Sequence, residues 1–329
     1  KDQAPSVTNW ENIIEAFLDS RSDRRGTTLR DLKTRMRRVL ETISANPKPR
    51  DGRTLMKRFA EMHFDNCPAG GQGRKRNLGD VEAFLEFAVK KAGAPQRWLP
   101  PDKEFKRTLI GSSTRTSAEA LTVPVKGQDL EMLLEGLASN EKHGLRLCVG
   151  LIGLFGLRPS ELGELTVDDG KLYVGQTKRN MQTLHKPKAA PRRVIAMDLP
   201  SLPNEGQRLI AQYDSGIVKF PLAISRAIQR AKEKDEYKEI GDALRQLLQR
   251  YWLWQSMEKR TQGLKVYSLR HGFAWRAHKE SENPLTVRDA SAFMGHDPQT
   301  HLKHYGRWVD EAGLEEAAAK FKKGQQVAA

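Results

Sequence analysis

Cysteine is scarce in this 329-residue chain, which contains two, Cys67 and Cys148. Two cysteines without CxxC spacing cannot build a disulfide framework, and they indicate a reducing compartment in which both thiols are free. Long apolar runs are also missing, because the longest, residues 147–157, is well below the roughly 20 residues that a membrane span needs. The sequence therefore excludes a disulfide-stapled domain and predicts a buried helix, not a membrane helix, over residues 147–157.

Acidic residues are also few. The chain has 41 Asp and Glu and 56 Lys and Arg, which gives a formal net charge of +15. A balance of this size suits a polyanionic partner, above all nucleic acid, better than a small neutral substrate. At 329 residues the chain exceeds the size at which one core usually stops growing, so two domains are expected. It starts at Lys1 without a methionine or a signal-peptide pattern, so we expect a shortened form of a cytoplasmic protein with no membrane partner.

Positive charge is concentrated near the N-terminus. Residues 21–58 contain thirteen Lys and Arg against four acidic residues. Apolar residues recur there at helical spacing, and basic residues fill the remaining circumference. A helix face that is merely solvated is the alternative interpretation. The apolar positions are Leu29, Leu32, Met36 and Leu40, and the basic ones are Arg30, Lys33, Arg37 and Arg38.

A second basic cluster consists of Arg74, Lys75 and Arg76 and follows a glycine-rich stretch, residues 70–73. We expect it in a loop just before a helix that starts at Asp80. Two basic clusters in one small domain favour contact with the phosphate backbone of DNA, which provides sequence-independent, salt-sensitive affinity.

The first part of the chain is expected to be helical. Thr8 and Glu11 have the spacing of a capping box and predict the start of the first helix. The helix from Asp80 should stop at Gly93, and three or four helices without a strand are expected up to about residue 110. Residues 111–124 are small and polar, which is typical of an interdomain linker.

A new helical domain is expected to begin near residues 130–137. Residues 171–175 and 192–197 have strand character and flank a loop rich in Lys and Pro, which predicts a hairpin with a long tip. Helices are expected again over residues 221–231 and 241–254. The predicted fold is mainly α with two domains: a helical domain over residues 1–112, a linker over 113–123, and a mixed α/β domain with a small antiparallel sheet over 124–329.

Three polar segments of the second half can provide an anion site. In the first, GLRPSEL, Arg158 follows a glycine bend and precedes a helix start at Pro159. Glu161, three residues on, can turn back and orient the guanidinium, which then offers a rigid bidentate fork to phosphate oxygens. A plain surface pair between Arg158 and Glu161 is the alternative.

The second segment, residues 266–278, places another guanidinium at a helix start. Ser268 can cap a helix whose first turn contains Arg270. Phe273, Ala274 and Ala277 should form the buried side of this helix. His271 is expected to be a core histidine that supports the site without acting in it.

The third segment, residues 293–305, breaks at Gly295, so that His296 emerges at the bend and Tyr305 ends a short amphipathic stretch. His296, His301 and His304 suggest zinc as an alternative. No cysteine or carboxylate completes a closed set of ligands, so no metal is predicted.

In these segments the chain resembles the tyrosine recombinases of the phage integrase family. That motif runs Arg, then Lys on a hairpin, then His-x-x-Arg, then His or Trp, then Tyr. It is similar to GLRPSEL with Arg158, VGQTKRN with Lys178, SLRHGFA with Arg270, and MGH with His296 followed nine residues later by Tyr305. The likeness covers residues 124–310 in detail, and the preceding basic region is similar to the family's core-binding domain in size, position and charge.

The resemblance implies a metal-free cleavage of DNA without a cofactor. Tyr305 would attack the scissile phosphate and form a covalent 3′-phosphotyrosine. Arg158 and Arg270 would clamp the nonbridging oxygens, and His296 would donate to the phosphate. A hairpin lysine would protonate the leaving 5′-oxygen, and Glu161 would support Arg158. The lysine is Lys178 in the family pattern, with Lys186 and Lys188 as nearby rivals that can also contact DNA.

Tyr267 departs from the pattern, because it stands where the family usually has the first His of His-x-x-Arg. A neutral imidazole accepts a proton near pH 7, whereas a phenol with a reference pKa of about 10 is mainly a donor there. Tyr267 is therefore expected to hydrogen-bond the phosphate and to be a poor base for Tyr305. A buried ring whose hydroxyl caps a loop is the alternative. Tyrosine at this position is similar to a cyanobacterial subgroup of excision recombinases and integrases.

The resemblance also implies partners. They are double-stranded DNA with inverted-repeat core sites, three further copies of the chain joined through exchange of a C-terminal helix over residues 311–323, and an accessory directionality factor. The location implied is the cytoplasm of a prokaryotic cell, with a chromosomal or a phage gene. Alternatives are an enzyme like the type IB topoisomerases or telomere resolvases, and a DNA-binding protein that kept the fold without catalysis.

Overall fold

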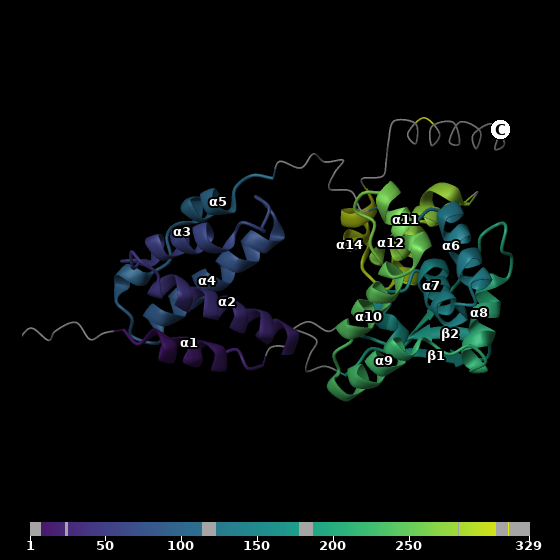
Figure 1. The fold of residues 1–329 in the computed structure, drawn as a ribbon, viewed down its shortest axis with the longest axis horizontal. Coiled ribbons are helices and arrows are strands. Elements are labelled where there is room, and N and C mark those ends of the chain that lie inside the picture. The colour runs from purple at the N-terminus through teal and green to yellow at the C-terminus, as the bar shows by residue number, and fades with distance from the viewer. Residues whose placement is uncertain are drawn as a thin grey trace, which may run out of the picture. The chain divides into compact units, whose positions relative to one another are not determined.

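The computed structural model describes residues 8–23, 26–113, 123–177, 187–281, 283–306 and Glu315. The chain forms two compact units, Lys1–Ala120 and Leu121–Ala329 (Figure 1). The predicted class of fold, mainly α-helical with a small antiparallel sheet, is confirmed. Most of the predicted linker and nearly all of the predicted helix 311–323 lie outside the described residues. In the part of the chain that is described, no helix has the length and apolar character needed to cross a membrane.

Unit 1 is a small helical bundle. Its described residues form five α-helices, which is more than the three or four expected. Asn9 caps the first helix by accepting from the Asn12 amide at 3.1 Å, so Thr8 is not the cap. Fully buried apolar side chains from four helices meet in one core, among them Phe17, Leu32, Met36, Phe59 and Phe84. The elements are α1 (Trp10–Asp19), α2 (Gly26–Ser44), α3 (Gly52–His63), α4 (Gln72–Lys90), the 3₁₀-helix η1 (Gln96–Trp98) and α5 (Lys103–Ile110).

Helix α4 starts at Gln72, not at Asp80, so the predicted basic loop is wrong. Gly71 provides the extended residue before the first turn, and Arg74, Lys75 and Arg76 therefore lie on the helix itself. Asp80 does not cap anything. Its carboxylate instead accepts from Arg35 at 2.6 Å and joins α4 to α2.

Unit 2 is built around a helix that is apolar on all sides. In α7 (His143–Phe155) every residue from Leu147 to Phe155 is buried, as predicted. Helices α6 (Gly127–Ser139), α8 (Glu205–Asp214) and α12 (Tyr267–Trp275) pack on it. The described part of unit 2 also contains η2 (Pro159–Gly163), α9 (Leu222–Lys234), α10 (Lys238–Gln249), α11 (Trp252–Arg260), the π-helix η3 (Arg276–Glu280), α13 (Val287–Met294) and α14 (Pro298–Tyr305).

The helix predicted over residues 241–254 is interrupted. Helix α10 ends at Gln249 and α11 starts at Trp252. The Tyr251 amide donates to the Leu248 carbonyl at 2.9 Å in the turn between them. The Tyr251 ring in this turn is buried, with 4% of its surface exposed.

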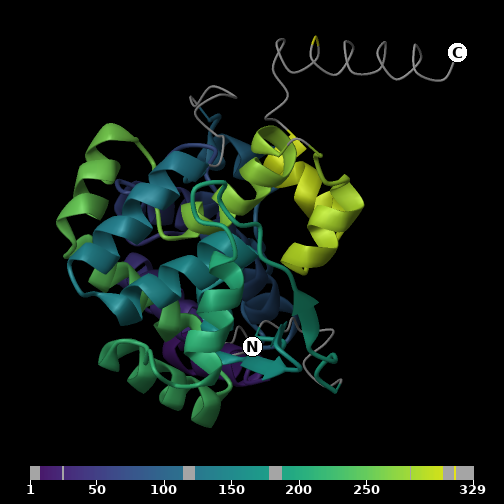
Figure 2. The same ribbon diagram turned by 90° about the vertical axis from the view of Figure 1, so that its right-hand side faces the viewer.

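Within the described residues, the sheet of unit 2 has three antiparallel strands in the order β1 (Leu165–Asp168), β2 (Lys171–Val174), β3 (Arg192–Val194). The predicted hairpin is β2–β3, although β3 ends at Val194 and not at residue 197. Strand β1 was not predicted. Its signal is Asp169-Gly170, two turn residues that both have positive φ (48° and 65°), as a tight two-residue hairpin turn requires. Helix α13 packs against β3, and Figure 2 shows the yellow C-terminal helices next to the teal strands.

Candidate active site

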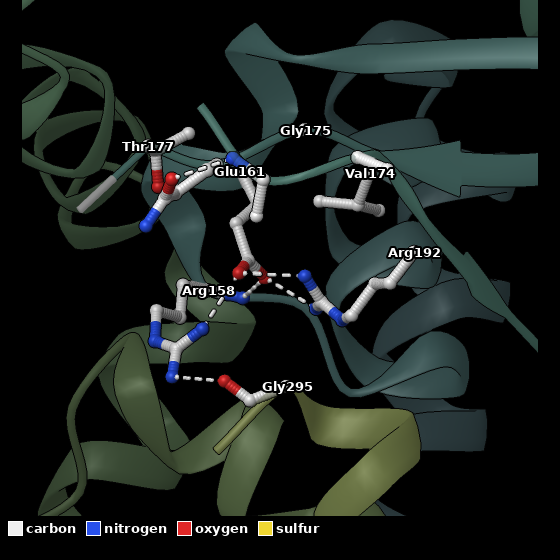
Figure 3. Close-up of a pocket in the computed structure, with 10 residues that line it drawn as sticks. Arg158, Glu161, Val174, Gly175, Thr177, Arg192 and Gly295 are labelled. Atoms are coloured by element: carbon white, nitrogen blue, oxygen red, sulfur yellow. Dashed lines mark hydrogen bonds and ion pairs between the residues drawn. The ribbon is translucent and has the colours of Figure 1, made fainter. Parts of the chain in front are cut away.

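The first arginine of the site is positioned by a glycine turn. Helix α7 ends at Phe155 and is followed by Gly156, whose φ of 66° is left-handed and whose absent Cβ would lie 2.8 Å from the Phe273 ring. The chain then reaches Arg158 at the start of η2. Glu161 turns back as predicted: its carboxylate accepts from the Arg158 backbone amide and from the Arg158 guanidinium, both at 2.7 Å (Figure 3). The remaining arm of Arg158 donates to the Gly295 carbonyl at 3.0 Å.

Glu161 also binds a second guanidinium that the sequence did not reveal. Arg192 of β3 donates to both Glu161 oxygens, at 3.1 Å and 3.0 Å (Figure 3). Arg270 Nη1 lies 3.7 Å from the same carboxylate. One buried carboxylate thus lies between three guanidiniums, from the residue before η2, from β3 and from α12. Nothing local identifies Arg192, because it is 31 residues from Glu161.

The charge of Glu161 is stabilised by these arginines. Burial alone would raise the pKa of the Glu161 carboxyl, but Arg192, Arg270 and Arg158 together keep this pKa below its usual value. Three guanidiniums against one carboxylate leave a local excess of positive charge, as a site for a phosphate anion requires.

Arg270 is the most enclosed cation of the site, with 1% of its surface exposed. Its guanidinium donates to the Gly156 carbonyl at 2.5 Å and to the Met294 carbonyl at 2.6 Å. Burial and then the like charge of Arg158 lower the pKa of Arg270. Phe273, Ala274 and Ala277 are fully buried, as predicted.

The predicted capping role of Ser268 is wrong. Helix α12 already starts at Tyr267, and no side chain caps it. The Ser268 hydroxyl instead accepts from the Lys265 backbone amide at 3.0 Å and closes the turn before the helix. Arg270 remains in the first turn.

Three histidines form a hydrogen-bonded chain behind Arg270. His296 Nδ1 is 3.0 Å from Arg270 Nη2, His296 Nε2 is 2.9 Å from His301 Nδ1, and His301 Nε2 is 2.7 Å from His278 Nε2. Arginine can only donate, so His296 must accept at Nδ1 and donate from Nε2, and each following imidazole must be neutral with a defined tautomer. Burial is the first cause that lowers the pKa of His296 to about 3 and that of His301 to about 4, in agreement with neutral rings.

This arrangement changes the interpretation of His296. Both of its ring nitrogens have partners within the protein, so in this state it orients Arg270 and has no free donor for a phosphate. His301, which is 1% exposed, was considered only as an alternative zinc ligand in the sequence. Among the described residues, no group of three or more His, Cys, Asp and Glu side chains is arranged to bind a metal ion.

Tyr305 lies at the end of α14 and is 5% exposed. Its hydroxyl is 3.0 Å from His271 Nδ1, and its ring lies 4.6 Å from the His301 ring between centroids. Burial raises the pKa of Tyr305 to about 12, although Arg270 opposes this shift. His271 is therefore a buried histidine, as predicted, but one in direct contact with the candidate nucleophile.

Tyr267 lies at the exposed side of the site. Its side chain is 40% exposed, which rules out the alternative of a buried ring that caps a loop. Its ring contacts the His271 ring at 5.1 Å between centroids, and, against the opposing effect of burial, Glu161 and then Tyr267 raise the pKa of Arg158.

Two hollows border Arg158. One, of about 280 Å³, is lined by the Arg158, Glu161 and Arg192 cluster together with Thr177 (Figure 3). The other, of about 670 Å³, lies on the Tyr267 side and includes Lys238, Arg245 and Lys265 in its lining. Arg158 is thus accessible to an anion that lies across the surface of unit 2.

The predicted general acid is not part of the described structure. Lys178 and its rival Lys186 both lie outside the described residues. Lys188 is described, and its ammonium forms an ion pair with Asp235 at 3.0 Å, 5.6 Å from the centre of the Tyr237 ring. Its hydrogen bond with Asp235 raises the pKa of Lys188. In this state Lys188 is engaged at the end of α9.

The predicted DNA-binding residues of unit 1 differ in exposure. Arg30, Lys33 and Arg37 are exposed on α2 and Arg38 is half-buried, while Leu32 and Met36 are fully buried on the opposite face. Lys75 and Arg76 are exposed on α4.

Arg74 has a different environment from its two neighbours. It donates to the Cys67 carbonyl at 2.8 Å and to the Leu109 carbonyl at 3.3 Å. Its guanidinium also lies 5.2 Å from the centre of the Phe64 ring. Arg74 therefore links the segment before α4 to the end of α5. These contacts do not support its predicted role as a phosphate ligand.

Comparison with known proteins identifies the fold. No protein-family model matches the sequence, and neither does any curated protein. Solved structures do match, and the fold of this chain is that of the tyrosine recombinases. An integrase of the transposon Tn1549, in complex with a circular intermediate DNA, is 13% identical over 96% of this chain and 100% of its own, with a TM-score of 0.59.

Two further structures agree. A lambda integrase dimer bound to a COC′ core site is 13% identical over 93% of this chain and 80% of its own, with a TM-score of 0.57. The XerH site-specific recombinase bound to a difH substrate is 13% identical over 89% of this chain and 79% of its own, with a TM-score of 0.52.

Proposed function

We propose that this protein is a site-specific DNA recombinase that cleaves and rejoins DNA through a covalent 3′-phosphotyrosine. The observation that supports this best is the contact of Tyr305 with His271, the neighbour on α12 of Arg270, whose guanidinium shares the Glu161 carboxylate with Arg158. A phenol beside two guanidiniums is suited to attack on a phosphodiester. The DNA-bound site-specific recombinases among the structural neighbours favour the same function.

In the proposed reaction the Tyr305 oxygen forms a bond to phosphorus as the bond from phosphorus to the 5′-oxygen breaks. Arg158 and Arg270 stabilise the charge on the nonbridging oxygens, and Glu161 and Arg192 hold Arg158 in place. A hairpin lysine, Lys178 by the family pattern, gives a proton to the leaving 5′-oxygen. The phosphotyrosine retains the energy of the phosphodiester, so a 5′-hydroxyl can later attack it and rejoin the strand.

The resting geometry implies a change on binding DNA. With 5% of its surface exposed, Tyr305 cannot reach a phosphate, and the guanidinium of Arg270 is bonded to backbone carbonyls. We therefore propose that DNA binding moves α14 outward and that His296 is released from His301 in the same step, so that it can donate to the phosphate.

Covalent trapping tests the proposed function. Full-length protein is incubated with a library of nicked duplexes, in which cleavage releases a short strand and prevents rejoining, and adducts that survive denaturation are sequenced. We expect a covalent adduct with the parent and none with Tyr305→Phe. Tyr213→Phe, which removes a half-buried hydroxyl that bonds the Leu165 carbonyl, is the matched control and should still form the adduct.

Three alternatives predict different results. An enzyme like the type IB topoisomerases would relax supercoiled plasmid without a preferred site, and a telomere resolvase would produce hairpin ends. A DNA-binding protein without catalysis would bind the library and form no adduct with any duplex. Recovery of joined strands from two different sites would support strand exchange.

We further propose the assembly. Unit 1 is a core-type DNA-binding domain, with Arg30, Lys33 and Arg37 on phosphates, and the DNA has inverted-repeat core sites. Four copies assemble on two sites through exchange of the helix over residues 311–323. Deletion of residues 311–329 is expected to spare cleavage more than assembly, which gel analysis of synaptic complexes measures. We propose that the protein acts in integration or excision together with a directionality factor. Its gene would be prokaryotic or carried by a phage.

A further inference from the structure

The proposed reaction needs a group that takes the proton of the nucleophile. Tyr267 occupies the position where the family has histidine, and a phenol is a poor acceptor near neutral pH. Its side chain is 40% exposed and lines the same hollow as Arg158. Tyr267 is thus a partner of the phosphate clamp, and the proton acceptor must lie elsewhere.

His271 is the imidazole that touches the nucleophile. Its Nδ1 lies 3.0 Å from the Tyr305 hydroxyl, and the two rings meet edge to face with centroids 5.6 Å apart. His271 follows Arg270 directly in α12, so the clamp and the imidazole are parts of one rigid helix turn. At 8% exposed, it is shielded from competing water.

Both groups of this hydrogen bond are neutral in the resting state. Burial lowers the pKa of His271 to about 3, and the neighbouring Arg270 and His304 act in the same direction, so the ring is neutral. Tyr305, with a pKa raised to about 12, keeps its proton in the resting state. With its proton on Nε2, the neutral His271 ring accepts at Nδ1 from the phenol.

We infer that His271 is the general base of the cleavage step and accepts the Tyr305 proton as the phenolic oxygen bonds to phosphorus. This inference rests on the proposed function and assigns the role that Tyr267 cannot fill.

The proton moves with the bond and not before it. In the resting state a transfer from Tyr305 to His271 is strongly uphill, as the two pKa values show. Once the phenolic oxygen is bonding to phosphorus it loses its basicity, and the phosphate charge stabilises the imidazolium that forms. One bond from oxygen to phosphorus forms, one breaks, His271 gains one proton, and the leaving 5′-oxygen gains another from the hairpin lysine. Rejoining returns the His271 proton to Tyr305.

A pair of substitutions separates a base from a positioning group. The amide oxygen of His271→Asn lies close to where Nδ1 was and can still accept the hydrogen bond from Tyr305, but it cannot take the proton. His271→Ala removes both functions. The exposed residue His143 on α7 provides the control His143→Ala. Rates of single-turnover adduct formation are measured on a duplex recovered by trapping, together with thermal unfolding and DNA affinity.

For a general base, both His271→Asn and His271→Ala should slow adduct formation by about 10²–10⁴-fold at unchanged DNA affinity. Replacing Tyr305 by a more acidic fluorotyrosine should then restore part of the missing rate in His271→Asn. A His271→Asn variant that cleaves within a few-fold of the parent would show that His271 only positions Tyr305 and would overturn the inference.

The parent protein provides a test that no folding defect can obscure. A substrate with sulfur in place of the leaving 5′-oxygen needs no proton on the leaving group, so any slowing of its cleavage in D₂O reports the proton of the nucleophile. We expect slowing, and equal rates in H₂O and D₂O would overturn the inference. If the parent forms no adduct with any duplex, the proposed function fails together with it.

Discussion

The two units use positive charge in opposite ways. On α2 of unit 1, Arg30, Lys33 and Arg37 are exposed and lie opposite a buried apolar face. In unit 2, Arg270 is 1% exposed, and Arg158 and Arg192 share the buried carboxylate of Glu161. Both regions are basic, but the exposed side chains of α2 can rearrange, whereas the buried arginines of unit 2 are fixed by their partners.

The difference shows how the same residue type provides two kinds of interaction. Exposed charges attract a polyanion at long range, are screened by salt and tolerate any sequence. Guanidiniums that are fixed by carboxylate and carbonyl partners present donors in one geometry, which stabilisation of a transition state requires. Affinity for DNA should therefore depend on the first region and the rate of cleavage on the second.

The largest effect is expected from removal of Glu161, the carboxylate that holds the buried arginines of unit 2. Glu161→Ala leaves three guanidiniums facing one another, and removal of one partner from a buried ion cluster costs about 3–5 kcal/mol. We expect a large fall in the free energy of unfolding of unit 2, measured by denaturant titration, and no cleavage. The control Glu239→Ala removes an exposed carboxylate that pairs with Arg230, which should change stability by less than about 1 kcal/mol. Equal stability of the two variants would contradict the clustered arrangement.

Acid should weaken the buried region next. His271 and His301 have folded-state pKa values of about 3 and about 4, both below the unfolded value of about 6.5. Between these values the unfolded chain binds protons that the folded chain does not, so stability is complete above about pH 6.5 and falls as the pH drops. Unfolding measured from pH 8 to pH 5 should show this decline, and His301→Gln should flatten it. The same slope in parent and variant would contradict the neutral histidine chain.

The exposed side should respond to salt and not to acid. Replacing Arg30, Lys33 and Arg37 together by alanine should reduce the slope of log affinity against log salt by about 0.9 for each DNA phosphate that is no longer neutralised. DNA affinity is measured by fluorescence anisotropy at several salt concentrations, and the rate of cleavage at saturating protein should stay close to that of the parent. A matched triple variant at exposed lysines elsewhere in unit 1 should keep the parental slope; these are Lys90, Lys91 and Lys103.

The smallest effect is expected at Tyr267, which is 40% exposed and lies at the edge of the buried arginine site. Tyr267→Phe removes one hydrogen bond of about 1–1.5 kcal/mol and should slow cleavage roughly tenfold. Tyr267→His keeps a donor and should be tolerated. Equal rates for the parent and Tyr267→Phe in single-turnover assays would exclude the proposed contact with the phosphate.

Several elements could be predicted because their signals are local. Helix α7 is apolar on all sides, so its burial follows from its sequence alone. Arg158 and Glu161 are three residues apart at a turn, and their contact is present as expected. Strand β1 was missed, although the turn residues Asp169-Gly170 are a local signal for the hairpin that it forms with β2.

Other features depend on segments that meet only in the folded chain. Arg192 and Glu161 are 31 residues apart, and His271 and Tyr305 are 34 apart. Arg270 donates to a carbonyl 114 residues away. No periodicity or spacing reports such interactions. Asp80 was mistaken for a helix start because its pairing with Arg35 of α2 is equally remote.

The sequence by itself determined the chemical groups available, the basic character and the buried helix that supports the site, because composition and short-range spacing decide these. Only the tertiary structure decided which groups lie together: Glu161 among three arginines, His296 bonded at both nitrogens, and Tyr305 on His271. The reason is physical, since a hydrogen bond needs its partners within about 3 Å, and packing of distant segments sets such distances.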